Sequence, residues 1–167
     1  MKITMYTDGS SRGNPGPGGW SAILMSEKEV VELGGREDMT TNNRMELLGA
    51  IEGLREINDK HTGALSVEVC TDSEYVKKGI SEWIKGWIAK GWKTSTKKDV
   101  LNKDLWERLL HEETRLKQNG VVVTWKYVRG HAGIPGNERA DTVATACADN
   151  ASSLQLYRGL REEYPYV

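Results

Sequence analysis

The sequence contains few cysteines and lacks any hydrophobic run of membrane-spanning length. Among its 167 residues only Cys70 and Cys147 are cysteines, and their spacing matches no pattern of paired metal ligands. Both fall within predicted regular elements, so we expect two reduced core thiols and a cytoplasmic protein. No apolar stretch approaches the roughly 20 residues that a membrane helix requires. Because a strand-like segment follows Met1 directly, without a basic and then apolar leader, we expect neither export nor membrane insertion.

An excess of charge of either sign is also missing. The formal net charge is -1 and the isoelectric point is about 6.3, so any binding to nucleic acid must depend on a local basic patch. The length and a hydrophobic content of 38% suit one globular domain, which we place at residues 1–150. Residues 151–167 form a tail whose order the sequence leaves open. We expect the protein to act as a monomer.

Hydrophobic periodicity predicts a mixed α/β fold. Residues 3–7, 20–25 and 30–33 are expected strands of an antiparallel meander, separated by a glycine- and proline-rich turn. A capped helix follows Thr40 to Asn43, and residues 65–71 form a strand that should pair in parallel with the first one. Residues 104–117 read as an amphipathic helix, and residues 121–128 as a strand filled on both faces. A helix of small residues comes last.

Four acidic residues stand where these elements begin or end. Asp8 and Asp72 end two neighbouring parallel strands, whose carboxyl ends are where open α/β sheets place ligands. Glu46 and Asp141 lie in the early turns of two helices. If all four converge, they repel one another unless cations lie between them. Mg2+ and Mn2+ accept such oxygen ligands, and two ions about 4 Å apart are the apparatus of phosphodiester hydrolysis. The alternative is that each acid only caps its own element.

A basic, tryptophan-rich segment covers residues 83–98. It contains five lysines, three tryptophans and no acidic residue, in a chain that is nearly neutral. Lysines interleaved with aromatic side chains suit a surface that follows a nucleic-acid backbone. The alternative is an amphipathic helix with packed tryptophans and solvated lysines, and both descriptions can apply to the same helix.

A glycine-rich loop before the last helix carries His131. A lone histidine in a loop usually has no function, but this one precedes Asp141 by ten residues. A mobile imidazole beside a metal site can relay protons near neutral pH. His61 and His111 lie in a turn and at an exposed helix position, and we assign them no function.

The motifs taken together resemble those of bacterial type 1 ribonuclease H. They follow the order of that family between residues 7 and 141: Thr7-Asp8-Gly9-Ser10 with Gly13-Asn14-Pro15-Gly16, Thr41-Asn42-Asn43-Arg44-Met45-Glu46, Thr71-Asp72-Ser73-Glu74-Tyr75-Val76, and Gly130-His131-Ala132-Gly133 with Asn137-Glu138-Arg139-Ala140-Asp141. The resemblance implies a three-layer fold with a five-stranded mixed sheet flanked by helices and a basic helical protrusion. It also implies endonucleolytic cutting of the RNA strand of RNA/DNA hybrids.

The resemblance implies roles for individual residues. Asp8, Glu46, Asp72 and Asp141 match the metal-binding carboxylates, and His131 matches a loop histidine that assists proton transfer or product release. Two Mg2+ ions in the substrate complex, or Mn2+ in their place, would activate the attacking water and stabilise the departing 3' oxygen. The products would carry a 5' phosphate and a 3' hydroxyl.

The resemblance also implies contacts to the hybrid. Asn14, Asn42 and Asn43 match residues that recognise RNA 2'-hydroxyl groups. Thr41 and Asn102 match parts of a pocket for a DNA phosphate, although Met39 replaces its usual arginine, for which Arg36 could substitute. Glu74 stands where relatives often have Gln, which would place an extra carboxylate near the metals. The expected contacts of the basic segment are Trp83, Lys85, Trp87, Lys90, Lys93, Lys97 and Lys98.

Two other functions are compatible with the same fold. A module that binds hybrids without cutting them is disfavoured because all four acids are present. An integrase or junction resolvase is disfavoured by the asparagine cluster and by the basic segment.

Overall fold

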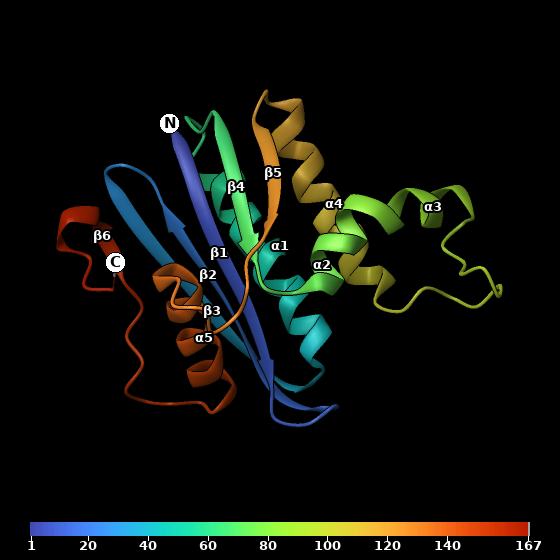
Figure 1. Cartoon of the computed structure of the whole chain (residues 1–167), viewed down its shortest axis with the longest axis horizontal. Coiled ribbons are helices and arrows are strands. Elements are labelled where there is room, and N and C mark those ends of the chain that lie inside the picture. The colour runs from blue at the N-terminus through green and yellow to red at the C-terminus, as the bar shows by residue number, and fades with distance from the viewer. Residues whose placement is uncertain (167) are drawn as a thin grey trace.

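The computed structural model describes residues 1–166, and a mixed sheet of six strands forms its centre (Figure 1). The strand order across the sheet is β5-β4-β1-β2-β3-β6. The strands are β1 (Lys2–Ser11), β2 (Gly16–Met25), β3 (Glu29–Thr40), β4 (Ser66–Thr71), β5 (Val122–Tyr127) and β6 (Arg158–Leu160).

The predicted strand pairings are confirmed. β1, β2 and β3 form an antiparallel meander, and β4 pairs in parallel with β1. The expected count of five strands is wrong, because the C-terminal tail adds β6, which pairs antiparallel with the start of β3. The expectation for residues 121–128 also needs correction. β5 forms an outer edge of the sheet, and 60% of Val122 and 44% of Tyr127 are exposed.

Helices cover both faces of the sheet. α1 (Asn42–Lys60) packs on one face, with α4 (Lys103–Gln118) against it, and α5 (Pro135–Ala148) packs on the other (Figure 1). The alternation of side chains along β2 supplies both cores, because Leu24 packs with α1 and its neighbour Ile23 packs with α5. Thr41 caps α1 by accepting a hydrogen bond from the backbone N–H of Arg44.

A protrusion extends away from the sheet between β4 and α4 (Figure 1). It contains α2 (Glu74–Lys78), the π-helix η1 (Gly79–Trp83), α3 (Ile84–Ala89) and the loop that follows. Its aromatic rings pack against one another in tilted arrangements, and Trp87 meets the fully buried Trp106 edge to face, with 5.4 Å between the ring centroids. The lysines of the segment remain exposed. The tryptophans therefore pack against one another, as the alternative of an amphipathic helix predicted. The lysine ammonium groups lie at the surface, where they are accessible to a binding partner.

The C-terminal tail is ordered as far as the structure describes it. The buried carboxylate of Glu32, on β3, accepts hydrogen bonds from the Arg139 guanidinium at 2.7 and 3.0 Å and from the Tyr164 hydroxyl at 2.6 Å. The backbone N–H of Tyr157 donates to the same carboxylate at 2.9 Å. We call these four residues the tail clamp. It joins the tail, α5 and β3.

Both cysteines are free thiols, and they differ in burial. Cys70 is buried, and Cys147 is half-buried beside the core under α5. The expected core position is therefore confirmed for Cys70 and holds in part for Cys147. Within residues 1–166, no helix combines the length and the apolar character needed to cross a membrane.

Candidate active site

Three of the four predicted acids meet at one end of the sheet. Thr7 on β1 and Thr71 on β4 are the last pair of the parallel ladder, so Asp8 and Asp72 follow side by side where this ladder ends. The expectation that Asp8 ends its strand is wrong, because β1 continues to Ser11 in its pairing with β2. Glu46 joins them from the first turns of α1. One carboxylate oxygen from each of these residues lies within 4.8 Å of the others. The sequence predicted this convergence correctly, while metal binding by the group stays a prediction.

The backbone at Gly9 explains how Glu46 reaches Asp8. A Cβ atom built on Gly9 would lie 2.2 Å from the backbone nitrogen of Glu46. β1 and α1 therefore touch through their backbones directly after Asp8, and only glycine leaves room for this approach. Any side chain at this position would push α1 away and separate two of the three carboxylates.

Burial and mutual repulsion dominate the electrostatics of this group. Only 5% of Asp8 and 4% of Glu46 is exposed. Burial raises the pKa of Asp8 well above its ordinary value, and the charges of Glu46 and Asp72 raise it further. Burial likewise raises the pKa of Glu46, to which the charge of Asp72 adds. The Oε1 atom of Glu46 is buried with no hydrogen-bond partner among the described residues. Three hard oxygen donors and one unpaired buried oxygen fit a divalent cation.

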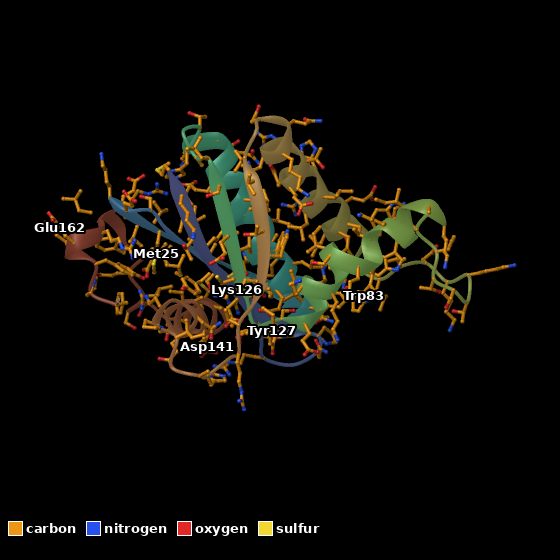
Figure 2. The ribbon with its side chains drawn as sticks, turned by 45° about the horizontal axis from the view of Figure 1, so that its top comes forward. Met25, Trp83, Lys126, Tyr127, Asp141 and Glu162 are labelled. Carbon is orange, nitrogen blue, oxygen red and sulfur yellow. The ribbon has the colours of Figure 1, made fainter. Side chains whose placement is uncertain are left out.

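Asp141 and His131 lie outside this group. Asp141 is half-buried on α5, and its carboxylate is not among the oxygens that lie within 4.8 Å of one another in the described structure. Figure 2 labels it on the helix that packs against β1 and β2. His131 is exposed in the loop between β5 and α5, with a left-handed backbone φ of 56°. The structure thus brings together three predicted ligands and places the fourth on a neighbouring element.

The sequence pattern assigned no role to Asn137, although this residue lies within one of the family motifs. The Asn137 Nδ2 atom donates a hydrogen bond to Asp72 Oδ2 at 3.2 Å, and the residue is 1% exposed. Its spacing of four residues from Asp141 could have drawn attention to it, because residues four apart lie on the same face of a helix.

The residues expected to contact a hybrid occupy two surfaces beside the carboxylates. The backbone N–H of Asn42 donates to Asn14 Oδ1 at 3.3 Å, which places the exposed asparagines of the β1–β2 turn and of α1 together. On the other surface, Asn102 accepts a hydrogen bond from Arg44 and donates one to the Tyr75 hydroxyl. Sequence reasoning missed Arg44, which lies between Thr41 and Asn102.

Two further charged residues, Glu74 and Arg36, lie beside the expected contacts. Glu74 is exposed, lies 3.6 Å from Lys78 on the same helix, and does not belong to the carboxylate group. The reason is that Glu74 begins α2, which directs its side chain towards solvent. Arg36 pairs with Asp38 and donates to the carbonyl of Ala148, and its substitution for the arginine missing at Met39 stays a prediction.

The basic segment presents its charge to solvent. Lys85, Lys90, Lys97 and Lys98 are exposed, and Lys93 is exposed but paired with Asp99. Trp83, at the base of the protrusion in Figure 2, is 38% exposed and stacks on Tyr75 and Trp87. Four lysines therefore carry unneutralised charge on this surface.

Comparison with known proteins agrees with this geometry. A model of the RNase H family matches residues 1–149. Ribonuclease HI of Caulobacter vibrioides is 52% identical over 166 residues, which cover 99% of this chain and 97% of the relative. Ribonuclease H of Chromohalobacter salexigens is 50% identical over 148 residues, covering 89% and 85%. The crystal structure of LC9-RNase H1, a type 1 RNase H with the type 2 active-site motif, matches with a TM-score of 0.75. Its identity is 33%, over 93% of this chain and 76% of the other.

Proposed function

The chain belongs to the RNase H family and is an endonuclease for the RNA strand of RNA/DNA hybrids, and we propose that Asp8, Glu46, Asp72 and Asp141 hold the divalent metal ions of this reaction. The observation that carries the proposal is the buried carboxylate group, whose charges repel one another and leave Glu46 Oε1 unpaired. A module that only binds hybrids would gain nothing from burying these acids at the cost of their solvation.

The residues of the chain would divide the work as follows. Two Mg2+ ions, or Mn2+ in their place, would supply an activated water and stabilise the leaving 3' oxygen, so that the products carry a 5' phosphate and a 3' hydroxyl. Asp8, Glu46 and Asp72 offer a preformed set of oxygen ligands from three elements. Asp141 would complete the set from α5. His131, exposed in its loop, would assist proton transfer or product release.

Recognition of the RNA strand is assigned to the asparagine cluster. Asn14, Asn42 and Asn43 are exposed and grouped beside the first turn of α1, the helix that delivers Glu46. Their amides can both donate and accept hydrogen bonds, as an RNA 2'-hydroxyl requires. The 2'-hydroxyl is the group that distinguishes RNA from DNA in the minor groove, so these contacts would select the strand that is cut.

The DNA strand would be held on the other side of α1. Thr41, Arg44 and Asn102 are joined by hydrogen bonds, and Arg44 would supply the guanidinium that Met39 lacks. Arg44 Nη2 lies 2.8 Å from Asp104 Oδ2. A bound phosphate would therefore compete with Asp104 for the Arg44 guanidinium. Beyond this pocket, the lysines and tryptophans of the basic segment would follow the hybrid backbone. Glu74 would lie at the minor groove, where its carboxylate accepts a hydrogen bond but donates none.

A single copy of the chain suffices for this proposal, because all four carboxylates come from one protomer. We therefore propose a monomer. A cytoplasmic location agrees with two cysteines that are both free thiols. Residues 1–150 would form the catalytic domain, with residues 151–167 as its appended tail.

The direct test is cleavage of a labelled RNA/DNA hybrid, with single-stranded RNA and double-stranded DNA as controls. We expect the RNA strand of the hybrid alone to be cut in Mg2+, and the activity to disappear with a chelator and return with added Mg2+ or Mn2+. Undiminished cutting after removal of all divalent ions would rule out the metal site. Tight hybrid binding without cutting in either metal would instead support the binding module.

The basic segment should control affinity rather than chemistry. Replacing Lys85, Lys90, Lys97 and Lys98 by Gln is expected to raise KM and leave kcat nearly unchanged, because the carboxylates lie on other elements. The slope of log affinity against log salt should fall by about 0.7 to 0.9 for each lost phosphate contact. The measurement is hybrid binding across a salt series.

The matched control for this experiment replaces four exposed lysines outside the segment: Lys2, Lys28, Lys60 and Lys117. It removes the same total charge, so it separates a general electrostatic effect from contacts at the protrusion. The control should keep the wild-type salt slope. If the two variants behave alike, the segment is only a packed and solvated helix.

A further inference from the structure

A buried amide in the first turn of α5 contacts the carboxylate group. Asn137 Nδ2 donates to Asp72 Oδ2 at 3.2 Å, and 1% of Asn137 is exposed. A hydrogen bond to a carboxylate from a donor with no access to water is stronger and more directional than one on the surface. The contact therefore restricts the rotation of the Asp72 side chain.

The chemical character of the donor suits a metal ligand. An amide can hold one oxygen of Asp72 without carrying a positive charge that would compete with a cation for the carboxylate. The other oxygen and the remaining lone pair of Oδ2 stay available. A lysine or arginine at this position would neutralise the ligand, and a second carboxylate would repel it.

A second element approaches the half-buried Asp72 carboxylate closely. A Cβ atom built on Gly130 would lie 2.9 Å from Asp72 Oδ2, so the backbone of the His131 loop passes directly over this oxygen. Two buried side-chain contacts anchor α5 to the sheet. Ser21 donates a buried hydrogen bond to the carbonyl of Ala140 at 2.6 Å, and Arg139 forms the ion pair with Glu32. Asn137 thus holds Asp72 from a fixed support.

The position of Asn137 links two of the proposed ligands. It lies one helical turn before Asp141, on the same face of α5. One hydrogen bond therefore ties the end of β4, which carries Asp72, to the helix that carries Asp141. Without this hydrogen bond, only weaker packing contacts would set the distance between the carboxylates of Asp72 and Asp141.

We propose that Asn137 is a positioning residue, which orients Asp72 for metal binding and sets the separation of Asp72 from Asp141. The role rests on the metal site of the proposed function and adds to it a residue outside the ligand set. Groups that hold a metal ligand through a hydrogen bond typically change metal affinity or activity by about 10- to 100-fold when removed.

The test measures metal binding without turnover. Mn2+ is titrated into the free protein by calorimetry, for wild type, Asn137→Ala and Ser21→Ala. We expect Asn137→Ala to bind Mn2+ about 10- to 100-fold more weakly and to need correspondingly more Mg2+ for half-maximal cleavage. Ser21→Ala removes a different buried anchor of α5, so it should lower the melting temperature while keeping wild-type Mn2+ affinity.

Other results separate the possible failures. Wild-type Mn2+ affinity in Asn137→Ala overturns the positioning role, and so does an equal loss of affinity in Ser21→Ala, which would show a general loosening of α5. If Asn137→Ala does not fold, Asn137→Ser is measured in the same way, because its hydroxyl is one bond shorter and does not reach Asp72. Failure of the wild-type protein itself to bind Mn2+ would instead refute the metal site of the proposed function.

Discussion

Asp8→Asn is expected to abolish hydrolysis of the hybrid and, at the same time, to stabilise the metal-free protein. The substitution keeps the shape of the side chain and removes one charged ligand from the buried group. Metal ions acting as Lewis acids supply several kcal/mol of transition-state stabilisation, so the expected loss in kcat is at least about 10^3-fold. Hybrid binding through the asparagine cluster and the lysines should persist.

The gain in stability follows from the raised pKa values. Between its ordinary pKa and its raised pKa, the Asp8 carboxyl keeps its proton in the folded state and loses it in the unfolded state. The unfolding free energy of the metal-free protein therefore falls as pH rises through this window. In Asp8→Asn this contribution is absent. The variant should match wild type near pH 3 and exceed it at neutral pH, by a margin that grows as the pH rises above the ordinary pKa of Asp8.

Chemical denaturation in the presence of a chelator, from pH 3 to pH 8, measures this difference. The comparison with wild type at each pH cancels the titration of acids distant from Asp8, such as Glu32 and Asp104, which have lowered pKa values. Glu107→Gln is the matched control, since Glu107 is an exposed acid on α4. It should change neither activity nor the pH profile. Activity of Asp8→Asn within tenfold of wild type in Mg2+ would contradict the assignment of Asp8.

Arg139→Met should lower the unfolding free energy by about 3–5 kcal/mol, because it leaves Glu32 charged and buried without its cation. None of the Glu32 side chain and 8% of the Arg139 side chain is exposed. Burial alone raises the pKa of Glu32, but hydrogen bonds from Arg139, Tyr164 and the Tyr157 backbone outweigh it and lower the pKa below its ordinary value. This carboxylate therefore stabilises the fold above its unfolded pKa, and the contribution is lost as pH falls through its folded pKa.

The measurement is the urea unfolding free energy at neutral pH. Arg12→Met is the matched control, because Arg12 also forms a bidentate pair with an acid, Asp149, but both side chains are about half exposed. Its expected effect is below about 1 kcal/mol. The double variant Glu32→Leu with Arg139→Met should recover much of the loss, since it removes the unpaired charge. A loss of under about 1 kcal/mol in Arg139→Met would show that the tail clamp does not hold α5 and the tail together.

Local patterns in the sequence determined the framework of the site. Alternating apolar residues and turn chemistry predicted β1, β2, β3 and β4, and the order of strands and helices predicted the parallel pairing of β1 with β4. From that pairing the proximity of Asp8 and Asp72 follows directly. The cap at Thr41 placed Glu46 in the first turns of α1. These inferences succeed because strand and helix periods are short-range properties. The sequence misplaced the end of β1, which continues past Asp8 to Ser11 because β2 pairs with it there.

The tertiary structure decided what depends on contacts between distant segments. Asn137 and Asp72 are 65 residues apart, and Glu32 and Arg139 are 107 apart, so neither pair leaves a periodic trace in the sequence. The sixth strand, β6, forms because the C-terminal tail pairs with the edge of β3 that faces away from β2. Tertiary packing also set three further features. These are the backbone contact at Gly9, the exposed edge at β5 and the position of Asp141 outside the carboxylate group. The sequence by itself determined which elements carry the acids. The packing of α1 and α5 on the sheet determined which acids come together, because this packing depends on contacts between side chains that are far apart along the chain.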